Sequence, residues 1–313
     1  GLPSTKVNFA SIENRGIEFN VTAKILTKKD WYWDFSFDIA KNLNKVTGLD
    51  SHYVSSPGSP SLRSTVIEEG KSLGLFFGYK TDGVFQSWDE INACETLNPD
   101  MPYQQKFSYD KLSPGDIKLV DLSGDGYVNL KTNNYEDMTV LGSSLPDFTG
   151  GMSTRFTWKW FTLSAQASFS YGNMKSWEAE GSQFTFNPNR PKNLLSLALN
   201  RWTPENPTNK YPKIKLNATS YGMTDFWLHD ASYLKIQNIS LTYRMPSNWL
   251  NKIGFLNRLE LFASVNNVYT FTDYPGPNPE SYDASNRIAG AAIDYTTYPQ
   301  TRTYNFGIKL SIK

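Results

Sequence analysis

The sequence predicts an all-β protein, an antiparallel segment of a transmembrane β-barrel with long extracellular loops. Residues 31–41 place every large apolar side chain on one parity and nearly every polar side chain on the other. Successive side chains of a strand point to opposite faces, so this segment is expected to be a strand with one apolar and one polar face. The same alternation recurs at residues 17–25, 161–171, 259–265 and 304–312.

Composition is consistent with strands that cross a lipid bilayer. Closure into a barrel pairs the backbone polar groups that lipid cannot solvate. The mean hydropathy is -0.49, and no run approaches the roughly 20 apolar residues that a membrane helix needs. Aromatic residues, which gather at the membrane interfaces of barrels, make up 15% of the chain. Four tryptophans beside short turns are expected at the inner interface, namely Trp31, Trp33, Trp158 and Trp160.

Nine strands are expected, with short and long connections in alternation. In outer-membrane barrels the short turns are periplasmic and the long loops lie outside. The expected strands span residues 16–28, 31–43, 61–69, 71–84, 148–158, 160–172, 231–244, 258–271 and 301–313. The long segments span residues 44–60, 85–147, 173–230 and 272–300, with a short helix expected over residues 193–202. An odd, open set of strands cannot close by itself.

Charge and cysteine content exclude several other classes. The formal charge is +1 without a basic block, so nothing indicates binding to nucleic acid. Cys94 is the single cysteine, which excludes an intrachain disulfide and a cysteine-ligated metal site and is typical of an exported protein. Gly1 is not followed by a signal peptide, so we expect that segment to have been removed or to precede the numbering.

Ten short motifs, in their order and spacing, resemble the C-terminal part of SusC-like (starch utilisation system) TonB-dependent transporters of the Bacteroidota. The motifs lie at residues 14–18, 83–87, 114–118, 121–126, 146–151, 231–235, 238–241, 266–269, 278–280 and 298–304. They include Asn-Arg-Gly-Ile-Glu at the first position and Pro-Asp-Phe-Thr-Gly-Gly at the fifth. The chain departs from the family at its last residues, 310–313, because family members commonly end on an aromatic residue.

The resemblance covers residues 1–313 and about the last third of such a transporter. It implies that the chain supplies strands 14 to 22 of a 22-stranded barrel, with the plug and N-terminal domains absent from this chain. It also implies TonB-dependent import of oligosaccharides or oligopeptides through the outer membrane of a Gram-negative bacterium. The implied partners are a SusD-like surface lipoprotein, the N-terminal part of the same transporter, TonB through that part, and outer-membrane lipid.

Aromatic residues in the long segments are the candidates for contacts with a ligand or a lid protein. Flat rings stack on sugar faces and pack against partner proteins, although long loops also need small cores of their own. The candidates are Trp88, Tyr103, Trp177, Phe184, Phe186, Trp202, Tyr221 and Trp227.

A calcium loop is a hypothesis for the run that begins at Asp121. Oxygen ligands at alternate positions and a glycine at the sixth position are typical of such loops. The ligands would be Asp121, Ser123, Asp125, Tyr127 and Asn129. Position twelve is Thr132 in place of the usual glutamate, which Glu136 or Asp137 could replace by folding back. A turn held by aspartate hydrogen bonds explains the same residues without a metal.

Catalysis finds little support in the sequence, so we expect no enzyme. His52 and His229 are far apart, and no serine lies in a nucleophile motif. Glu178 and Glu180 share a parity near Trp177, which would suit a glycosidase, but a solvated loop face is the preferred interpretation.

Three alternatives stay open at this point. A passive outer-membrane porin would show the same strand alternation without a plug or lid. A soluble carbohydrate-binding β-sandwich would bury the apolar faces against each other. An outer-membrane enzyme would require a catalytic role for Glu178 or Glu180.

Overall fold

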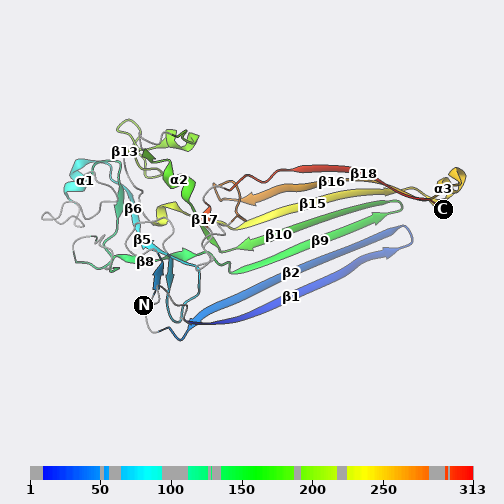
Figure 1. Cartoon of the computed structure of the whole chain (residues 1–313), viewed down its shortest axis with the longest axis horizontal. Helices are drawn as coiled ribbons and strands as arrows, with labels where there is room; N and C mark the ends of the chain where they lie inside the picture. The colour runs from blue at the N-terminus through cyan, green and yellow to red at the C-terminus, as the bar shows by residue number, and fades with distance from the viewer. Residues whose placement is uncertain are drawn as a thin grey trace, which may run out of the picture.

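The structure is a computed structural model of the whole chain. It describes residues 10–49, 53–55, 65–93, 112–125, 128, 135–186, 192–216, 224–281, 293–294 and 297–312. A long antiparallel sheet occupies one side of the molecule, and a domain built from the long connections lies at one end of that sheet (Figure 1). We call the second part the loop domain.

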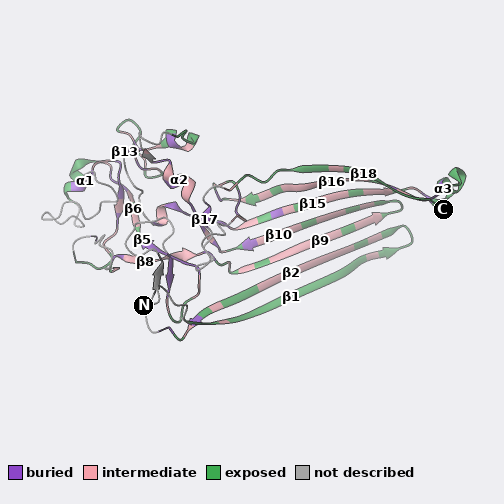
Figure 2. Ribbon diagram, viewed as in Figure 1, coloured by how far each residue is buried: buried purple, intermediate pink, exposed green. Residues whose placement is uncertain are grey.

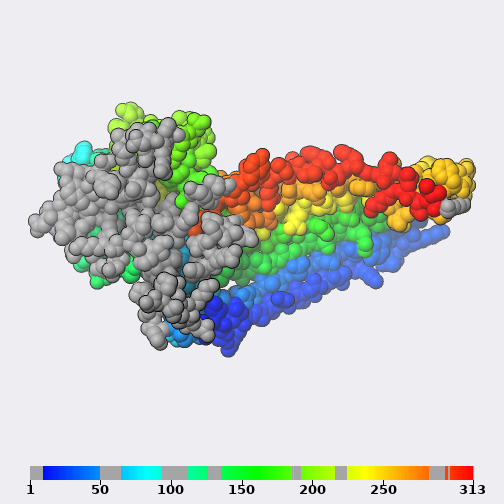
Figure 3. Space-filling view, in the orientation of Figure 1, coloured from blue at the N-terminus to red at the C-terminus, as the bar shows by residue number. Residues whose placement is uncertain are grey.

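The long sheet has seven strands, and every neighbouring pair is antiparallel. Their order is β1 (Ser11–Lys28), β2 (Trp31–Thr47), β9 (Phe148–Trp158), β10 (Phe161–Tyr171), β15 (Tyr233–Arg244), β16 (Leu256–Thr272) and β18 (Thr303–Ile312). Figure 3 shows them side by side, from β1 in blue to β18 in red. The predicted all-β, antiparallel fold is confirmed.

The prediction of nine sheet strands is wrong for residues 61–69 and 71–84. These residues form β4 (Thr65–Ile67), β5 (Leu75–Tyr79) and β6 (Thr81–Val84), which belong to small sheets of the loop domain. The physical reason is visible in β5, where five consecutive residues are all buried. A barrel strand needs one lipid-facing parity and one inward-facing parity, whereas β5 is apolar on both and fills a core.

One face of the long sheet is apolar from edge to edge. The register places Phe19 opposite Ile39 and Leu163 opposite both Phe156 and Leu241. Ile308 lies opposite Leu261 near the last edge. Figure 2 shows these strands as mainly exposed or intermediate, with few buried residues, while most buried residues gather in the loop domain. Within the described residues, no second sheet pairs with this sheet, and apolar side chains of this face such as Phe306 and Ile308 are exposed, which contradicts the soluble β-sandwich alternative.

Two aromatic belts border the apolar face. Trp31, Trp158, Phe161 and Tyr243 follow one another across four strands, with ring centroids 5.0 to 6.5 Å apart. At the other end Phe148 stacks on Tyr171 at 5.0 Å. Tyr171 lies ten positions after Phe161 in β10, which is about 33 Å along the strand and about 25 Å of height at a tilt of about 40°. This height matches the apolar band of an outer-membrane barrel.

The opposite face of the sheet carries hydrogen-bonded polar pairs. Asp34 and Arg155 form an ion pair at 2.9 Å, and Asn238 donates to Asn266 at 2.7 Å. The contrast between the two faces reflects strand alternation across the seven strands. Register shifts at residues 25, 237 and 257 interrupt the pairing locally.

Short turns join the strands at the end away from the loop domain. Residues 29–30 connect β1 to β2, and residues 159–160 connect β9 to β10. The third turn contains α3 (Ser247–Ile253), which ends at Gly254 with φ of +83°. The predicted tryptophans lie beside these turns and are each about two-fifths exposed.

The loop domain is assembled from three connections, residues 48–147, 172–232 and 273–302. Its first sheet contains β3 (Tyr53–Ser55), β4, β5 and β8 (Met138–Ser143), and β6 pairs with β7 (Ile117–Leu119). A three-stranded sheet contains β14 (Leu228–Asp230), β11 (Met174–Trp177) and β17 (Ile293–Asp294), and β12 (Thr185–Phe186) pairs with β13 (Lys215–Leu216). Its helices are α1 (Trp88–Asn92), α2 (Glu178–Ser182), η1 (Ser196–Asn200) and η2 (Asp225–Trp227).

Among the described residues, no helix combines the length and the apolar character needed to cross a membrane. The predicted helix over residues 193–202 is the shorter 3-10 helix η1.

Candidate functional site in the loop domain

The three connections are held together by specific polar contacts. In the first contact, Trp202 donates its indole N–H to Oε1 of Gln86 at 2.9 Å. Nε2 of Gln86 donates to Oδ1 of Asn209 at 3.0 Å, and the same oxygen accepts from the backbone N–H of Val84. Residues of the first and second connections thereby share one network.

A buried carboxylate makes the second contact between these two connections. Asp116 is 1% exposed and lies 2.9 Å from Nζ of Lys215 and 3.5 Å from Nζ of Lys213. The neighbouring Gly115 has φ of +92°, and a Cβ there would lie 2.5 Å from the ring of Trp202. Only glycine allows this close approach at that backbone conformation.

Lys175 joins the second connection to the third. Its ammonium donates to the carbonyls of Asn278 at 3.2 Å and Pro279 at 2.6 Å, and to Ser281, and it lies 5.3 Å from the ring centroid of Tyr274. The side chain is buried on β11, and burial lowers the pKa of Lys175 from 10.5 to about 8. Three carbonyls from one loop therefore converge on one ammonium.

A second buried carboxylate completes this region. The hydroxyl of Tyr274 donates to Oδ2 of Asp294 at 3.0 Å, while Oδ1 of Asp294 accepts from the hydroxyl of Thr297 at 2.6 Å. Burial, followed by the charge of Asp294, raises the pKa of Tyr274 far above its usual range. None of these three residues was predicted from the sequence, because isolated Tyr, Asp and Thr residues in irregular segments carry no periodic signal.

Glu180 does not lie on a solvated face, in contrast to the sequence interpretation. It is 2% exposed and pairs with Nε2 of His229, and its charge adds to the effect of burial in raising the pKa of Tyr211. His52 lies outside the described residues. Glu180 therefore joins α2 to β14 as an internal contact of the loop domain.

Four of the predicted ligand-contacting aromatic residues lie in the interior of the loop domain. Phe184 stacks on Trp227 at 5.5 Å, and both belong to the largest core, together with Tyr79, Ile117, Leu119 and Val128. Trp177 packs with Ala231 and Tyr274, and Trp202 is 8% exposed. In this conformation these rings support the shape of the loop domain and do not face solvent.

The other four predicted residues differ in position. Trp88 is the first residue of α1 and is 57% exposed. Phe186 is half-buried at the end of β12. Tyr103 and Tyr221 lie outside the described residues. Trp88 is therefore the predicted contact residue whose side chain is exposed to solvent.

The Asp121 turn uses its carboxylates as backbone acceptors. Oδ1 of Asp121 accepts from the N–H of Gly124 at 2.7 Å, and Oδ1 of buried Asp137 accepts from the N–H groups of Leu122 and Ser123, both at 3.2 Å. Tyr127 and Asn129 lie outside the described residues, while Asp125 lies within them. Within the described part, no cluster of three acidic, histidine or cysteine residues could hold a metal. Calcium binding stays a prediction, and titration of calcium into the protein and its Asp125→Ala variant tests it.

A further exposed feature surrounds η1. Leu199 is 77% exposed, and Leu194 and Leu195 just before this helix are also exposed. Exposed leucines on a folded domain that lies beyond the apolar band are typical of a surface that contacts another protein.

Together, the seven-stranded sheet and the loop domain define one side of a transmembrane-type β-barrel with large loops at one end. No protein-family model matches the sequence. The chain is 30% identical, over 99% of its length, to TonB-dependent receptor P39 of Formosa agariphila, and 24% identical over 97% to TonB-dependent receptor SusC of Bacteroides thetaiotaomicron. Among solved structures, the RagAB peptide transporter superposes on 97% of the chain with a TM-score of 0.68 and 22% identity.

The chain is thus a homologue of SusC-like TonB-dependent receptors over nearly its whole length, and the resemblance predicted from its motifs is confirmed. It spans 31% of the length of P39 and 27% of that of SusC. The relatives are named as receptors and importers, which fits the expectation that the chain is not an enzyme.

Proposed function

We propose that the chain forms part of the wall and the outer loops of an outer-membrane importer of the SusC type. In this proposal TonB drives the import of oligosaccharides or oligopeptides, and a SusD-like lipoprotein covers the loop domain. The observation that carries the proposal is one continuous apolar sheet face, bordered by two aromatic belts, with a folded loop domain at one end only.

The apolar face supports membrane insertion. Ile17, Phe306 and Ile308 are each more than three-fifths exposed, which would be costly in water over so large a surface. The indole of Trp33 on this face has a partner, because it donates to the hydroxyl of Thr154 at 2.9 Å. In hydrocarbon, unpaired polar groups cost several kcal/mol, so this pairing suits lipid.

The loop domain supports recognition of a lid and a cargo. Its buried network would hold Trp88 and the leucines around η1 in fixed positions, which lowers the entropic cost of binding. The names of two relatives suggest two cargo classes, since one is SusC, of a starch utilisation system, and the other is a peptide transporter. A passive porin would have no use for such a domain.

Uptake by the native host tests the proposal. We expect deletion of the gene for the full-length receptor to abolish uptake of fluorescently labelled oligosaccharides or of labelled oligopeptides, whichever is the cargo. Loss of TonB should have the same effect. Uptake that survives loss of TonB but not loss of the receptor would identify a passive porin instead.

A second measurement tests the lid. We expect Leu199→Asp in the full-length receptor to reduce co-purification of a surface lipoprotein at least tenfold, because a charge would enter an apolar contact. Asn200→Asp is the matched control, since it places the same charge on the neighbouring exposed residue of η1. Equal loss in both variants would count against a specific lid contact.

A further inference from the structure

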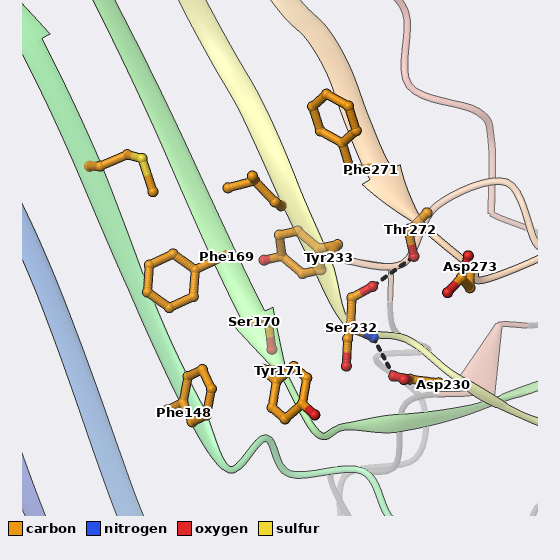
Figure 4. A pocket seen from close by; sticks show the side chains of 12 residues that line it. Phe148, Phe169, Ser170, Tyr171, Asp230, Ser232, Tyr233, Phe271, Thr272 and Asp273 are labelled. Atoms are coloured by element: carbon orange, nitrogen blue, oxygen red, sulfur yellow. Dashed lines mark hydrogen bonds between the residues drawn. The ribbon is translucent and has the colours of Figure 1, made fainter.

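A hollow lies on the apolar face of the sheet beside the loop domain. Its volume is about 570 Å³, within the range of small-molecule sites. Most of the residues that line it come from β9, β10, β15 and β16, and the others are Asp230 at the end of β14, Ser232 and Asp273; all are shown in Figure 4. They include Phe148, Met152, Phe169, Leu234 and Phe271, all on the apolar parity of the sheet.

The hollow lies between the rings of Phe169 and Phe271, which each pack away from it. Gly150 has no side chain, and a Cβ there would lie 2.5 Å from Cζ of Phe169, so the ring of Phe169 extends over β9. Phe271 packs against Tyr269 of its own strand, with centroids 4.6 Å apart. Between the two rings lies only the shorter side chain of Leu234, which pairs with both Phe169 and Phe271 in the sheet register.

Two carboxylates lie at the end of the hollow nearest the loop domain. Asp230 and Asp273 line the hollow and are exposed. Asp230 accepts from the N–H of Ser232 at 2.8 Å. Within the described residues, neither aspartate forms an ion pair with a lysine or arginine. The hollow is therefore apolar along its floor and negative at its mouth.

We propose that this hollow binds one lipid molecule, with an acyl chain against Leu234 and an ammonium headgroup against Asp230 and Asp273. The proposal rests on the proposed membrane location of the apolar face. Hydrocarbon is then the medium that meets the floor of the hollow, and the aspartates lie at the level where headgroups begin. Two carboxylates repel a bare phosphate and attract an ammonium, so they select the headgroup.

Native mass spectrometry of the full-length receptor, delipidated in detergent, tests the proposal with phosphatidylethanolamine as the probe. We expect one tightly retained molecule on the unaltered receptor and at least tenfold less on Leu234→Trp, whose ring fills the hollow. Leu241→Trp is the matched control, since it lies on the same face of β15 opposite Leu163 and should retain the lipid. Equal retention in the two variants would overturn the proposal.

The headgroup is tested separately. Asp230→Asn combined with Asp273→Asn should reduce the preference for phosphatidylethanolamine over phosphatidylglycerol at least fivefold. Binding of phosphatidylglycerol with Mg²⁺ in place of phosphatidylethanolamine would overturn the ammonium assignment. Displacement of the lipid by a synthetic triacylated lipopeptide at lower concentration would show that the hollow holds a lipoprotein anchor, which also overturns it.

Failure of this inference can be told from failure of the proposed function. Insertion of the receptor into vesicles, measured by protease protection, should be equal for the unaltered receptor and Leu234→Trp. If the unaltered receptor does not insert, the membrane proposal fails. If both insert but lipid retention does not differ, only the lipid site fails.

Discussion

At the residue scale, Lys175 shows how one side chain orders a long segment. Residues 273–281 contain three prolines and no strand or helix beyond the end of β16, so their backbone lacks the regular hydrogen bonds of a sheet. The ammonium of Lys175 replaces part of that pairing by donating hydrogen bonds to three carbonyl groups. Sequence periodicity cannot reveal such a role, because the role depends on the position that the ammonium occupies in the folded protein.

Replacement of Lys175 by methionine should release this loop. The methionine side chain is similar in length but has no donor, so the carbonyls of Pro279 and Ser281 lose the donor Lys175 at about 1 to 3 kcal/mol, while the carbonyl of Asn278 keeps its bonds from Ser281. Hydrogen exchange of the amides of residues 278, 280 and 281 should accelerate by one to two orders of magnitude. Lys252→Met, on exposed α3, is the control and should leave that exchange unchanged.

The same lysine predicts a pH dependence. Its pKa is about 8 in the folded loop domain and 10.5 in the open state, so between these values the open state binds more protons. The free energy of opening should therefore rise with pH over this window, by up to about 1 kcal/mol per pH unit. Exchange at β11, corrected for its intrinsic pH dependence, would show this slope in the unaltered receptor. A slope that persists in Lys175→Met would contradict the assignment.

At the scale of single elements, the alternation of apolar and polar residues predicted the strands whose two faces meet different surroundings. Seven expected strands match β1, β2, β9, β10, β15, β16 and β18 within a few residues. Residues 71–84 were expected to form a strand of the same kind, although Leu75, Phe76 and Phe77 are apolar in succession. That lack of alternation was the available signal for a buried strand of the loop domain.

Neighbouring residues of β10 should be destabilised to different extents by the same charge. Leu163 lies on the apolar face and is 45% exposed, whereas Ser164 points to the polar face opposite Arg155 and Ser240. Leu163→Asp should cost about 1 to 2 kcal/mol in lipid, where a carboxylate costs less than a basic side chain, and Ser164→Asp should cost less than about 1 kcal/mol. Urea titrations of the full-length receptor folded into vesicles would measure both. Equal costs would place the two faces in similar surroundings.

At the scale of the whole molecule, the aromatic candidates illustrate what sequence can and cannot place. Their location in the loop domain followed from the long connections, and the structure confirms that Trp177, Phe184 and Trp227 lie there. Whether each ring points inward depends on contacts between connections that are far apart in sequence, such as β11 with β17. A single sequence carries no signal for such pairing, so only burial in the structure separates Trp88 from the others.

The edges of the long sheet predict how the chain behaves alone. In the described residues β1 pairs only with β2, and β18 pairs only with β16, so each edge leaves a row of backbone groups without a strand partner. Open edges and an exposed apolar face drive association with other chains. We expect residues 1–313, expressed alone and refolded in detergent, to elute as polydisperse aggregates in size-exclusion chromatography, whereas the full-length receptor elutes as a single species. A monodisperse monomer of residues 1–313 in detergent-free buffer would contradict both the open edges and a lipid-facing sheet.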